Sequence, residues 1–287
     1  ALMEQWRKTA YDETLGKPLY KLLERIKNSI RYMIMGDTLF ERLGIKYLGP
    51  INGHDIPALI KILERTKQED GPVLVHVATK KGKGYPPAEE NPEKYHGVSS
   101  SEGSIEGAES FSIAMGEELI RAARENDGVC AITAGMPLGT GLRHFAALYP
   151  SRFFDVGICE QHALALAAGL AKGGMRPFVA IYSTFLQRGL DQVFHDICLQ
   201  GLPVVILEDR AGLTGEDGEA HQGIYDLGFL RGMPNLSIMA PRDIPTLKYM
   251  MELALKSSSP SLIRYPKGCN IKISVNQPLE PYRWQYI

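Results

Sequence analysis

The sequence predicts an α/β fold, a doubly wound parallel sheet that follows a partial, mostly helical N-terminal segment. From about residue 107 onward, strand-like apolar runs alternate with helical patterns, which is the order expected of βαβ units and a parallel sheet. The earlier run at 71–79, "GPVLVHVAT", is almost continuously apolar, as in a parallel strand covered on both faces. With 44% hydrophobic and 23% charged residues, the composition is that of a globular protein.

The first hundred residues have a different pattern. Residues 1 to about 48 are charged and amphipathic, which predicts helices, and 47–55, "YLGPINGHD", predicts a turn. Apolar residues at helical spacing predict a helix over 56–68, before the strand at 71–79. A polar loop rich in Gly, Pro and Lys then covers 80–104. We place a domain boundary at about 97–106, which gives domains of 1–98 and 99–287.

The second domain has a regular order of elements. We expect strands at 129–134, 152–157, 176–183, 202–210, 236–241 and 261–266. We expect helices at 107–125, 160–174, 185–200 and 243–257. The connections between parallel strands should be right-handed crossovers.

Charge, hydropathy and cysteine spacing exclude several classes of protein. The formal net charge of the 287 residues is −1, so no overall field favours nucleic acid or a membrane surface. No apolar run is long enough to span a bilayer. The four cysteines show neither CxxC pairs nor the spacing of metal ligands, so we expect reduced, buried thiols in a cytoplasmic protein. The chain opens "ALMEQW", without a leading Met, and we interpret it as a fragment.

Polar and aromatic residues follow the predicted strands, at the edge where ligands bind in open parallel sheets. These residues are Glu160, His162, Tyr182, Ser183, Phe185, Arg188, Asp209, Arg210, Asp217, His221, Arg264 and Lys267. An acid, a base, cations and aromatic rings at one edge favour an active site. The loop 208–223, "EDRAGLTGEDGEAHQG", has glycines that permit close backbone approach to a ligand, and its spacing fits neither a zinc nor a calcium site.

Single residues also have simpler interpretations. Glu160 opens a helix, where a carboxylate is favoured by the helix dipole alone. His162 and Phe185 are compatible with core positions, and Arg188 with a surface salt bridge. For each single residue these alternatives stay open. The clustering of all these residues at one edge of the sheet supports an active site more strongly than any one of them does.

Longer stretches resemble the 1-deoxy-D-xylulose-5-phosphate synthase family, thiamine-diphosphate enzymes of the transketolase superfamily. The resemblance is carried by "YLGPINGHD" (47–55), by 71–98 with "TKKGKGY", by 153–196 with "EQH" and "STFLQR", and by 202–243 with "DRAG" and "HQG". It implies the pyrimidine-binding fold for 99–287 and a remnant of the diphosphate-binding domain, with the interdomain loop, for 1–98. Another transketolase-like transferase is a weaker alternative, because "STFLQR" and "GEDGEAHQG" argue against it.

The resemblance assigns roles around the cofactor, thiamine diphosphate. Glu160 would contact N1′ of its aminopyrimidine and share a proton with that ring, while the cofactor supplies the electron sink. Phe185 would stack on the aminopyrimidine, Lys81 would lie near the diphosphate, and Ile158 would also contact the cofactor. His221 and His96 would donate or shuttle protons, which together with Glu160 and Asp217 makes the implied catalytic set.

The resemblance also names substrates, pyruvate and D-glyceraldehyde 3-phosphate, which would give 1-deoxy-D-xylulose 5-phosphate and CO2 for isoprenoid and thiamine precursors. Tyr182, Arg188, Asp217 and His221 would line the substrate channel. Arg210 and Lys267 would hold the triose phosphate, and Arg264 is a further cation that would help to bind it. Lys267 in "RYPKG" replaces a usual Arg, so the two-pronged hydrogen bond to phosphate is lost and we expect weaker binding.

The family's magnesium motif is absent from this sequence. Family members use GDG and a later Asn, whereas the nearest string here is "MGDTLF" at 35–40. We therefore assign no magnesium ligand in the chain, although Mg²⁺ is expected with the cofactor. Two functions remain: the complete reaction, or an inactive pyrimidine-binding module that needs a separate diphosphate-binding chain. We expect a homodimer and no nucleic acid or membrane partner.

Overall fold

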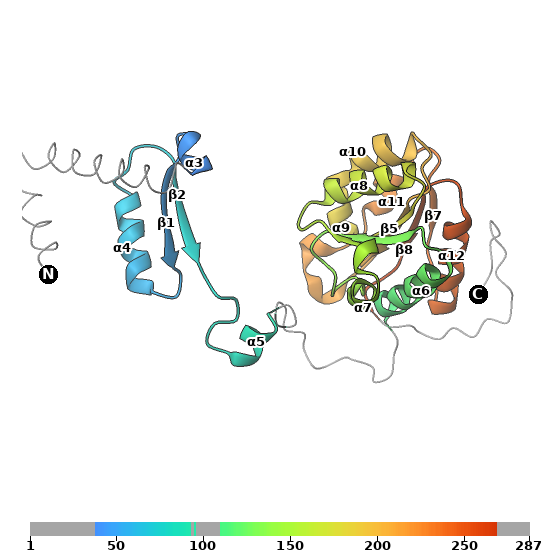
Figure 1. Ribbon diagram of the computed structural model, residues 1–287, viewed down its shortest axis with the longest axis horizontal. Helices are drawn as coiled ribbons and strands as arrows, with labels where there is room; N and C mark the ends of the chain where they lie inside the picture. The colour runs from blue at the N-terminus through green and yellow to red at the C-terminus, as the bar shows by residue number, and fades with distance from the viewer. Residues whose placement is uncertain (1–37, 93–94, 96–109, 269–287) are drawn as a thin grey trace, which may run out of the picture. The chain divides into compact units, whose positions relative to one another are not determined.

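The computed structural model describes residues 38–92, 95 and 110–268. The chain divides into two compact units, Ala1–Val98 and Ser99–Ile287, and each is described by itself (Figure 1). The described elements of the first unit are α3 (Leu39–Arg42), β1 (Lys46–Asn52), α4 (Ile56–Thr66), β2 (Val73–Ala78) and α5 (Pro86–Glu90). Most of the helical pattern predicted for residues 1–48 lies outside the described residues.

Strands β1 and β2 pair in parallel and α4 connects them. Helix α4 begins after Asp55, whose carboxylate accepts the N–H of Ala58 at 3.0 Å; this is an N-cap that satisfies a free helix-end donor. The predicted helix over 56–68 and the predicted strand over 71–79 are thereby confirmed.

The turn predicted for 47–55 is confined to Gly53 and His54, because residues 47–52 belong to a strand. Tyr47 and Leu48 are in strand β1, paired with Leu74 and Val75 of β2, and the pairing resumes at Ile51 after an irregularity. Pairing with a neighbouring strand outweighs the turn preference of the Gly, Pro and Asn residues, as tertiary context often does.

Two further expectations for the first unit also change. The loop 80–104 contains α5, which begins with two prolines at positions where a helix needs no N–H. Strand β2 was expected to be covered on both faces, but His76, Val77 and Ala78 are exposed within the described part of the chain.

The second unit is built on a six-stranded sheet in which every neighbouring pair is parallel. Its strand order is β4-β3-β5-β6-β8-β7. The strands are β3 (Val129–Thr133), β4 (Phe153–Asp155), β5 (Arg176–Tyr182), β6 (Val205–Asp209), β7 (Ser237–Met239) and β8 (Ser261–Arg264). The main helices are α6 (Phe111–Glu125), α7 (Arg143–Leu148), α8 (Glu160–Lys172), α11 (Asp226–Leu230) and α12 (Ile244–Lys256). All six predicted strands are present, and helices lie on both faces of the sheet (Figure 1), so the predicted doubly wound α/β fold is confirmed.

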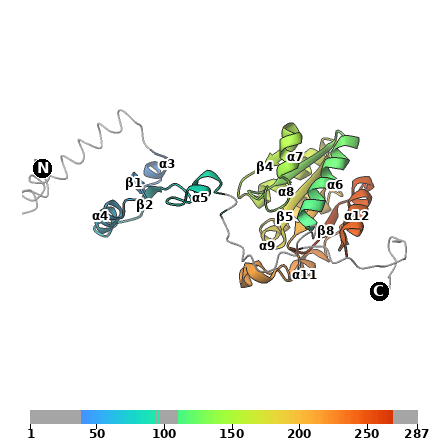
Figure 2. The same cartoon turned by 90° about the horizontal axis from the view of Figure 1, so that it is seen from below.

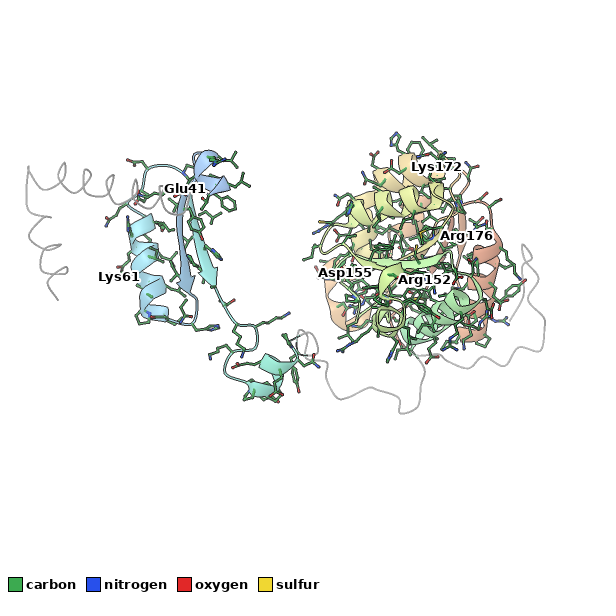
Figure 3. All side chains as sticks on the ribbon, viewed as in Figure 1. Glu41, Lys61, Arg152, Asp155, Lys172 and Arg176 are labelled. Atoms are coloured by element: carbon green, nitrogen blue, oxygen red, sulfur yellow. The ribbon has the colours of Figure 1, made fainter. Side chains whose placement is uncertain are left out.

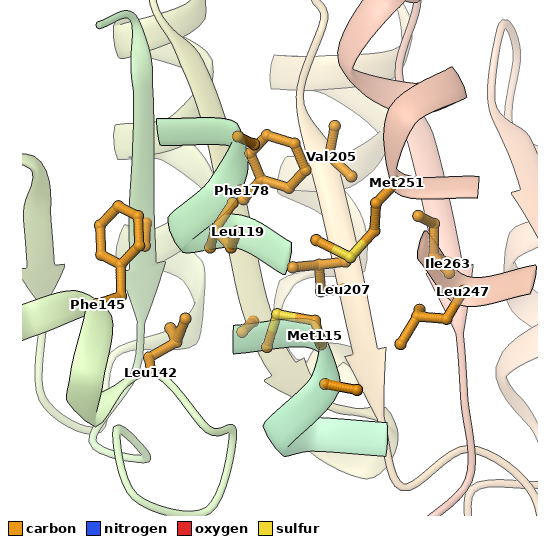
Figure 4. Close-up of a cluster of buried hydrophobic side chains, with 14 of the residues drawn as sticks. Met115, Leu119, Leu142, Phe145, Phe178, Val205, Leu207, Leu247, Met251 and Ile263 are labelled. Carbon is orange, nitrogen blue, oxygen red and sulfur yellow. The ribbon is translucent and has the colours of Figure 1, made fainter. Parts of the chain in front are cut away.

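Each face of the sheet has its own hydrophobic core. On one face, α6 and α12 lie side by side (Figure 2) and, with α7, bury Met115, Leu119, Phe145 and Met251 against the sheet (Figure 4). On the other face, α8 and α11 contribute to a second cluster. Helix α8 buries Leu164 there together with four small side chains, Ala163, Ala167, Ala168 and Ala171.

The helix predicted over 185–200 is broken into short pieces. They are α9 (Ser183–Leu186), a 3₁₀ turn (Gln187–Gly189), α10 (Leu190–Gln192) and a π-helical turn (Val193–Cys198). The break falls where the segment meets α8, because a Cβ at Gly189 would lie 2.3 Å from Cδ1 of Leu164. The short helices α7 and α11 were not predicted.

The expectation of buried thiols is only partly met. Cys130 and Cys198 are buried, whereas Cys159 is exposed, because it sits in the turn between β4 and α8. Cys269 lies outside the described residues. In the described part of the chain, no helix combines the length and the apolar character needed to cross a bilayer.

The packing of α6 gives a prediction. Replacing Leu119 by Ala leaves a cavity in the first core, so the variant should lose about 2–5 kcal/mol of unfolding free energy. Denaturant titration followed by circular dichroism would measure this loss. The control is Leu148→Ala on α7, where the side chain is 57% exposed and the expected change is within about 0.5 kcal/mol. Equal losses in the two variants would contradict the described packing.

Candidate functional site

At the carboxyl edge of the sheet, hydrogen bonds to one carboxylate connect the loops that follow β3 and β4. Asp155 ends β4, and its Oδ1 accepts the N–H groups of Gly135 at 2.7 Å and Gly157 at 3.0 Å (Figure 3). Both glycines have positive φ, 76° and 68°, a conformation that costs other residues energy. The loops after β3 and β4 are therefore joined just before α8 begins.

Glu160 is the first residue of α8 and is only 2% exposed. Its Oε2 lies 3.4 Å from Nη1 of Arg188, a side chain that is 58% exposed. A buried carboxylate needs such a partner, and the helix N-terminus also favours negative charge. The observed contact is thus consistent with both interpretations of Glu160, as a helix-end acid and as a group placed for proton transfer.

Three rings form a continuous aromatic group beside this helix. The Phe185 ring centroid lies 5.5 Å from that of Tyr182 and 5.8 Å from that of His221, the latter in an edge-on arrangement. The Tyr182 hydroxyl fills space over the loop after β3, where a Cβ on Gly139 would lie 1.8 Å from it. Burial raises the pKa of Tyr182, against the opposing charge of Arg210, so this phenol is neutral at ordinary pH.

Next to the rings, one carboxylate joins two cations. Asp217 accepts from Nη1 of Arg210 at 2.7 Å through Oδ2 and from Nζ of Lys267 at 2.5 Å through Oδ1. The Arg210 guanidinium also lies over the Tyr182 ring, 3.9 Å from its centroid, a favourable cation–π geometry. Arg210 has φ of 60°, which turns the chain sharply after β6.

The electrostatics of this group favour the ionised form of Asp217. Burial raises the pKa of Asp217, but the hydrogen bond from Lys267 and the charges of Arg210 and Lys267 outweigh it, so the pKa is lowered overall. Asp217 is therefore ionised at neutral pH, and it faces two cationic groups. The neighbouring Asp209 also faces Arg210 and Lys267, so two carboxylates balance the two cations, which are side chains of the kind that bind an anionic group such as a phosphate.

The loop that carries Asp217 and His221 is closed by its own backbone. Gly212 and Gly223 exchange N–H···O bonds of 2.6 and 2.8 Å. Gln222 accepts the N–H of Thr214 at 2.9 Å and donates to the carbonyl of Gly218 at 2.9 Å. The glycine-rich sequence thus folds as a compact loop against the edge of the sheet.

The remaining predicted residues lie away from these contacts. Arg264 forms two hydrogen bonds to the buried Asp226, at 2.5 and 3.3 Å. Ile158 is 78% exposed. His162 is exposed as well, so the core interpretation of this histidine is wrong: it faces outward on the first turn of α8. Lys81 belongs to the first unit, and His96 lies outside the described residues.

The sequence analysis missed several polar groups at this edge, among them Ser112, Glu208 and Asp226. Ser112 donates to Oδ2 of Asp209 at 2.7 Å, and burial raises the pKa of Asp209 to about 6, although this hydrogen bond opposes the rise. No motif marks these residues: Ser112 and Asp226 each lie between apolar or aromatic neighbours, and Glu208 is the last residue but one of a buried strand. Only strand register could have suggested that Glu208 faces Arg264.

The described residues do not supply an obvious metal site. In ranges 38–92 and 110–268, no group of three or more His, Cys, Asp or Glu side chains is arranged to hold a metal ion.

Comparison with known proteins gives two family matches. Residues 109–270 match the transketolase pyrimidine binding domain, and residues 1–79 match 1-deoxy-D-xylulose-5-phosphate synthase. Curated relatives named 1-deoxy-D-xylulose-5-phosphate synthase include those of Natranaerobius thermophilus, 49% identical over 93% of this chain and 43% of that protein, and Caldanaerobacter subterraneus, 51% identical over 88% and 42%. The chain spans less than half the length of these relatives.

Solved structures give the same fold. A protein titled "Split gene transketolase, inactive beta4 tetramer" is 30% identical, with a TM-score of 0.54 over 62% of this chain and 58% of that chain. The transketolase of Campylobacter jejuni is 18% identical, with a TM-score of 0.55 over 86% of this chain and 51% of its own; at that identity the likeness concerns the fold alone.

The ion pairs of Asp217 give a prediction. Asp217→Asn should lower the unfolding free energy at pH 7 by about 1–3 kcal/mol, because hydrogen bonds to charged groups are lost. The folded pKa is below the unfolded value of 3.8, so this contribution is present above that value and is lost as pH falls through the folded pKa.

Denaturant titrations of both proteins from neutral pH to about pH 2.5 would test it, since the difference between them should shrink toward the acid end. A difference that stays constant over the whole range would show that the ionised form of Asp217 contributes nothing.

Proposed function

Since the chain belongs to the transketolase pyrimidine-binding family and its N-terminal part matches 1-deoxy-D-xylulose-5-phosphate synthase, we propose that it takes part in the condensation of pyruvate with D-glyceraldehyde 3-phosphate. The products are 1-deoxy-D-xylulose 5-phosphate and CO2. The observation that carries the proposal is the buried Glu160, the first residue of α8, which pairs with Arg188 of the segment that also holds Phe185, one of the three contacting rings of Tyr182, Phe185 and His221.

The residues at this edge fit the pyrimidine part of thiamine diphosphate. A flat, half-buried Phe185 suits stacking on an aromatic ring, and a buried carboxyl suits a hydrogen bond with a ring nitrogen. When bound, the cofactor supplies the carbon nucleophile and electron sink of the reaction. Glu160, Phe185 and Ile158 are the residues of the second unit proposed to hold it, and Lys81 is proposed to lie near its diphosphate.

Glu160 and His221 are proposed to handle protons. Glu160 would hold a proton at the cofactor's ring nitrogen, with Arg188 balancing the charge of the carboxylate from the solvent side. The imidazole of His221, fixed edge-on against Phe185, would exchange a proton with the oxygen of the reacting carbonyl, a role suited to histidine near neutral pH. His96 is proposed to share this role.

Arg210 and Lys267 are proposed to bind the phosphate of the aldehyde substrate. Both already share Asp217 as a counter-ion, so their charged ends converge on one place. Tyr182, Arg188 and Asp217 would complete the substrate channel. Arg264 was expected to help with the phosphate, and in the structure it is engaged by Asp226.

The wider setting is also part of the proposal. Residues 1–98 would be the remnant of a diphosphate-binding domain and 99–287 the pyrimidine-binding domain. Mg²⁺ would accompany the cofactor, and we derive no step through it, because the described residues offer no ligand cluster. We further propose a homodimer and a cytoplasmic location.

A second function is favoured by one observation in the first unit. Within residues 38–92 its sheet has two parallel strands, and α4 exposes Ile56, Ile60 and Leu63 at 59%, 53% and 50%. Parallel sheets are normally covered on both faces, whereas within residues 38–92 these apolar side chains of α4 are left exposed to solvent. The chain would then be a pyrimidine-binding module that acts with a separate diphosphate-binding chain.

An assay of Glu160 variants tests the proposed function. Glu160→Ala should lower pyruvate consumption in the presence of D-glyceraldehyde 3-phosphate, thiamine diphosphate and Mg²⁺ by at least about 100-fold, with an unchanged circular dichroism spectrum. The control is Glu117→Gln, a charge change at an exposed position of α6. Normal turnover by the Glu160 variant would refute the assignment.

The same assay separates the two functions. It is run on the chain alone and after addition of the diphosphate-binding part of a curated relative. Turnover by the chain alone supports the complete reaction, and turnover only in the mixture supports the module. Absence of turnover in both would contradict both functions.

Lys267 gives a further prediction. Lys267→Arg should lower the KM for D-glyceraldehyde 3-phosphate about 3–10-fold, because arginine binds phosphate through two parallel hydrogen bonds. Steady-state kinetics should show little change in kcat and in the KM for pyruvate. A lower KM for pyruvate instead would place Lys267 near the other substrate.

A further inference from the structure

A buried polar cluster lies next to the loop that carries Asp217 and His221. Its members come from four elements: Ser183 from α9, Glu208 from β6, Asp226 from α11 and Arg264 from β8. Three of them, Ser183, Glu208 and Asp226, are 0–3% exposed. None of the roles proposed above accounts for Glu208.

Strand register places Glu208 beside Arg264. In the sheet, Glu208 pairs with Ile181 of β5 on one side and with Arg264 of β8 on the other. Alternate residues of a strand share a face, and Ile206 and Leu262 both belong to the second core. Glu208 and Arg264 therefore lie side by side on the face that α8 and α11 cover.

Arg264 is nevertheless engaged by a different acid. It donates to Asp226 through two nitrogens, at 2.5 and 3.3 Å, the fork arrangement that arginine forms with carboxylates. Both oxygens of Glu208 are buried and accept no hydrogen bond within the described part of the chain, and the hydroxyl of Ser183 is likewise without one. An ionised carboxylate in that position would be strongly disfavoured.

The charges around Glu208 lead to the same conclusion. Burial raises the pKa of Glu208 to about 8, and Asp226 adds to the rise, whereas the charge of Arg264 and the hydroxyl of Ser183, a donor near the carboxyl that forms no hydrogen bond of normal geometry with it, oppose the rise. Tyr265, fully buried at the end of β8, is a further titratable group near Glu208, and its own pKa is raised by burial. One guanidinium thus serves two carboxyl groups, and the structure shows it paired with Asp226.

The 211–226 loop contacts two residues that lie near Glu208, Ser183 and Arg264. Gly223 packs against Ser183 so closely that a Cβ there would lie 2.8 Å from the serine Oγ. Three residues later, Asp226 is held by Arg264. If Glu208 were ionised, its charge would repel Asp226 and compete for Arg264, and the ion pair of Asp226 with Arg264 would weaken.

We propose that Glu208 is a positioning residue that stays protonated at neutral pH, and that its neutral carboxyl leaves Arg264 free to hold Asp226 and so anchors the 211–226 loop. The loop carries Asp217 and His221, so the protonation of a residue that touches neither controls where they lie. This inference concerns the chain itself and does not depend on the proposed reaction.

Amide hydrogen exchange of the full chain tests the proposal. Protection of peptides covering 211–226 is compared in wild type and Glu208→Gln from about pH 4.5 to about pH 9.5, and the ratio of the two cancels the intrinsic pH dependence of exchange. Between the ordinary glutamate pKa of 4.5 and the raised value of about 8, the wild type should lose protection by up to about tenfold per pH unit, because loop opening releases the proton of Glu208. Above about pH 8 the loss should level off, and Glu208→Gln, which has no proton to release, should show no such loss and should be at least as protected as wild type at pH 7.

Two further variants keep the outcome interpretable. Glu117→Gln, at an exposed position, should titrate as wild type does. Asp226→Asn should lose protection of the loop at every pH, since it removes the anchor itself. The proposal is overturned if Glu208→Gln titrates as wild type does, or if it loses protection at pH 7, which would mean that the ionised carboxylate holds the loop. Infrared difference spectra of wild type and Glu208→Gln at pH 7 should also show a protonated carboxyl band only in wild type.

Discussion

The parallel register of β5, β6 and β8 is the constraint on which the rest of the second unit depends. Because all three strands run in one direction, Tyr182, Asp209 and Arg264 emerge at the same edge, and their neighbours Glu208 and Ile181 follow in fixed lateral order. The helices bury the apolar residues on the two faces of the sheet, and the segments that follow the strands carry the polar residues of the candidate site. A slip of one residue in β6 would exchange the faces of Glu208 and Asp209 and dismantle both polar groups.

The edge contains two separate electrostatic arrangements of opposite character. At the outer edge, Arg210 and Lys267 share the carboxylate of Asp217, and these two cations are the groups proposed to contact an anionic ligand. In the interior, Glu208 and Asp226 share the single guanidinium of Arg264, which leaves one carboxyl to remain neutral. The outer edge is suited to binding a charged group, and the interior to holding the loop that presents it.

Much of this could be predicted from the sequence, and the failures have physical causes. Alternating patterns predicted the α/β fold because helix and strand periodicities differ, and strand ends predicted which residues gather. The strand at Lys46–Asn52 was missed because its pairing with β2, invisible locally, outweighs Gly49 and Pro50. The pairing of Arg264 with Asp226 was missed for the same reason: 38 residues separate them, and no pattern joins them.

The most direct test of the central claim, that this edge binds the pyrimidine part of thiamine diphosphate, is calorimetric titration of the chain with thiamine diphosphate and Mg²⁺, in wild type and Phe185→Ala. Loss of stacking on Phe185 should weaken binding by about 1–3 kcal/mol, or roughly 5–150-fold, as for other aromatic rings that hold a base. Equal affinity of the two proteins would contradict the claim, and so would the absence of binding to wild type both alone and after addition of the diphosphate-binding part of a curated relative.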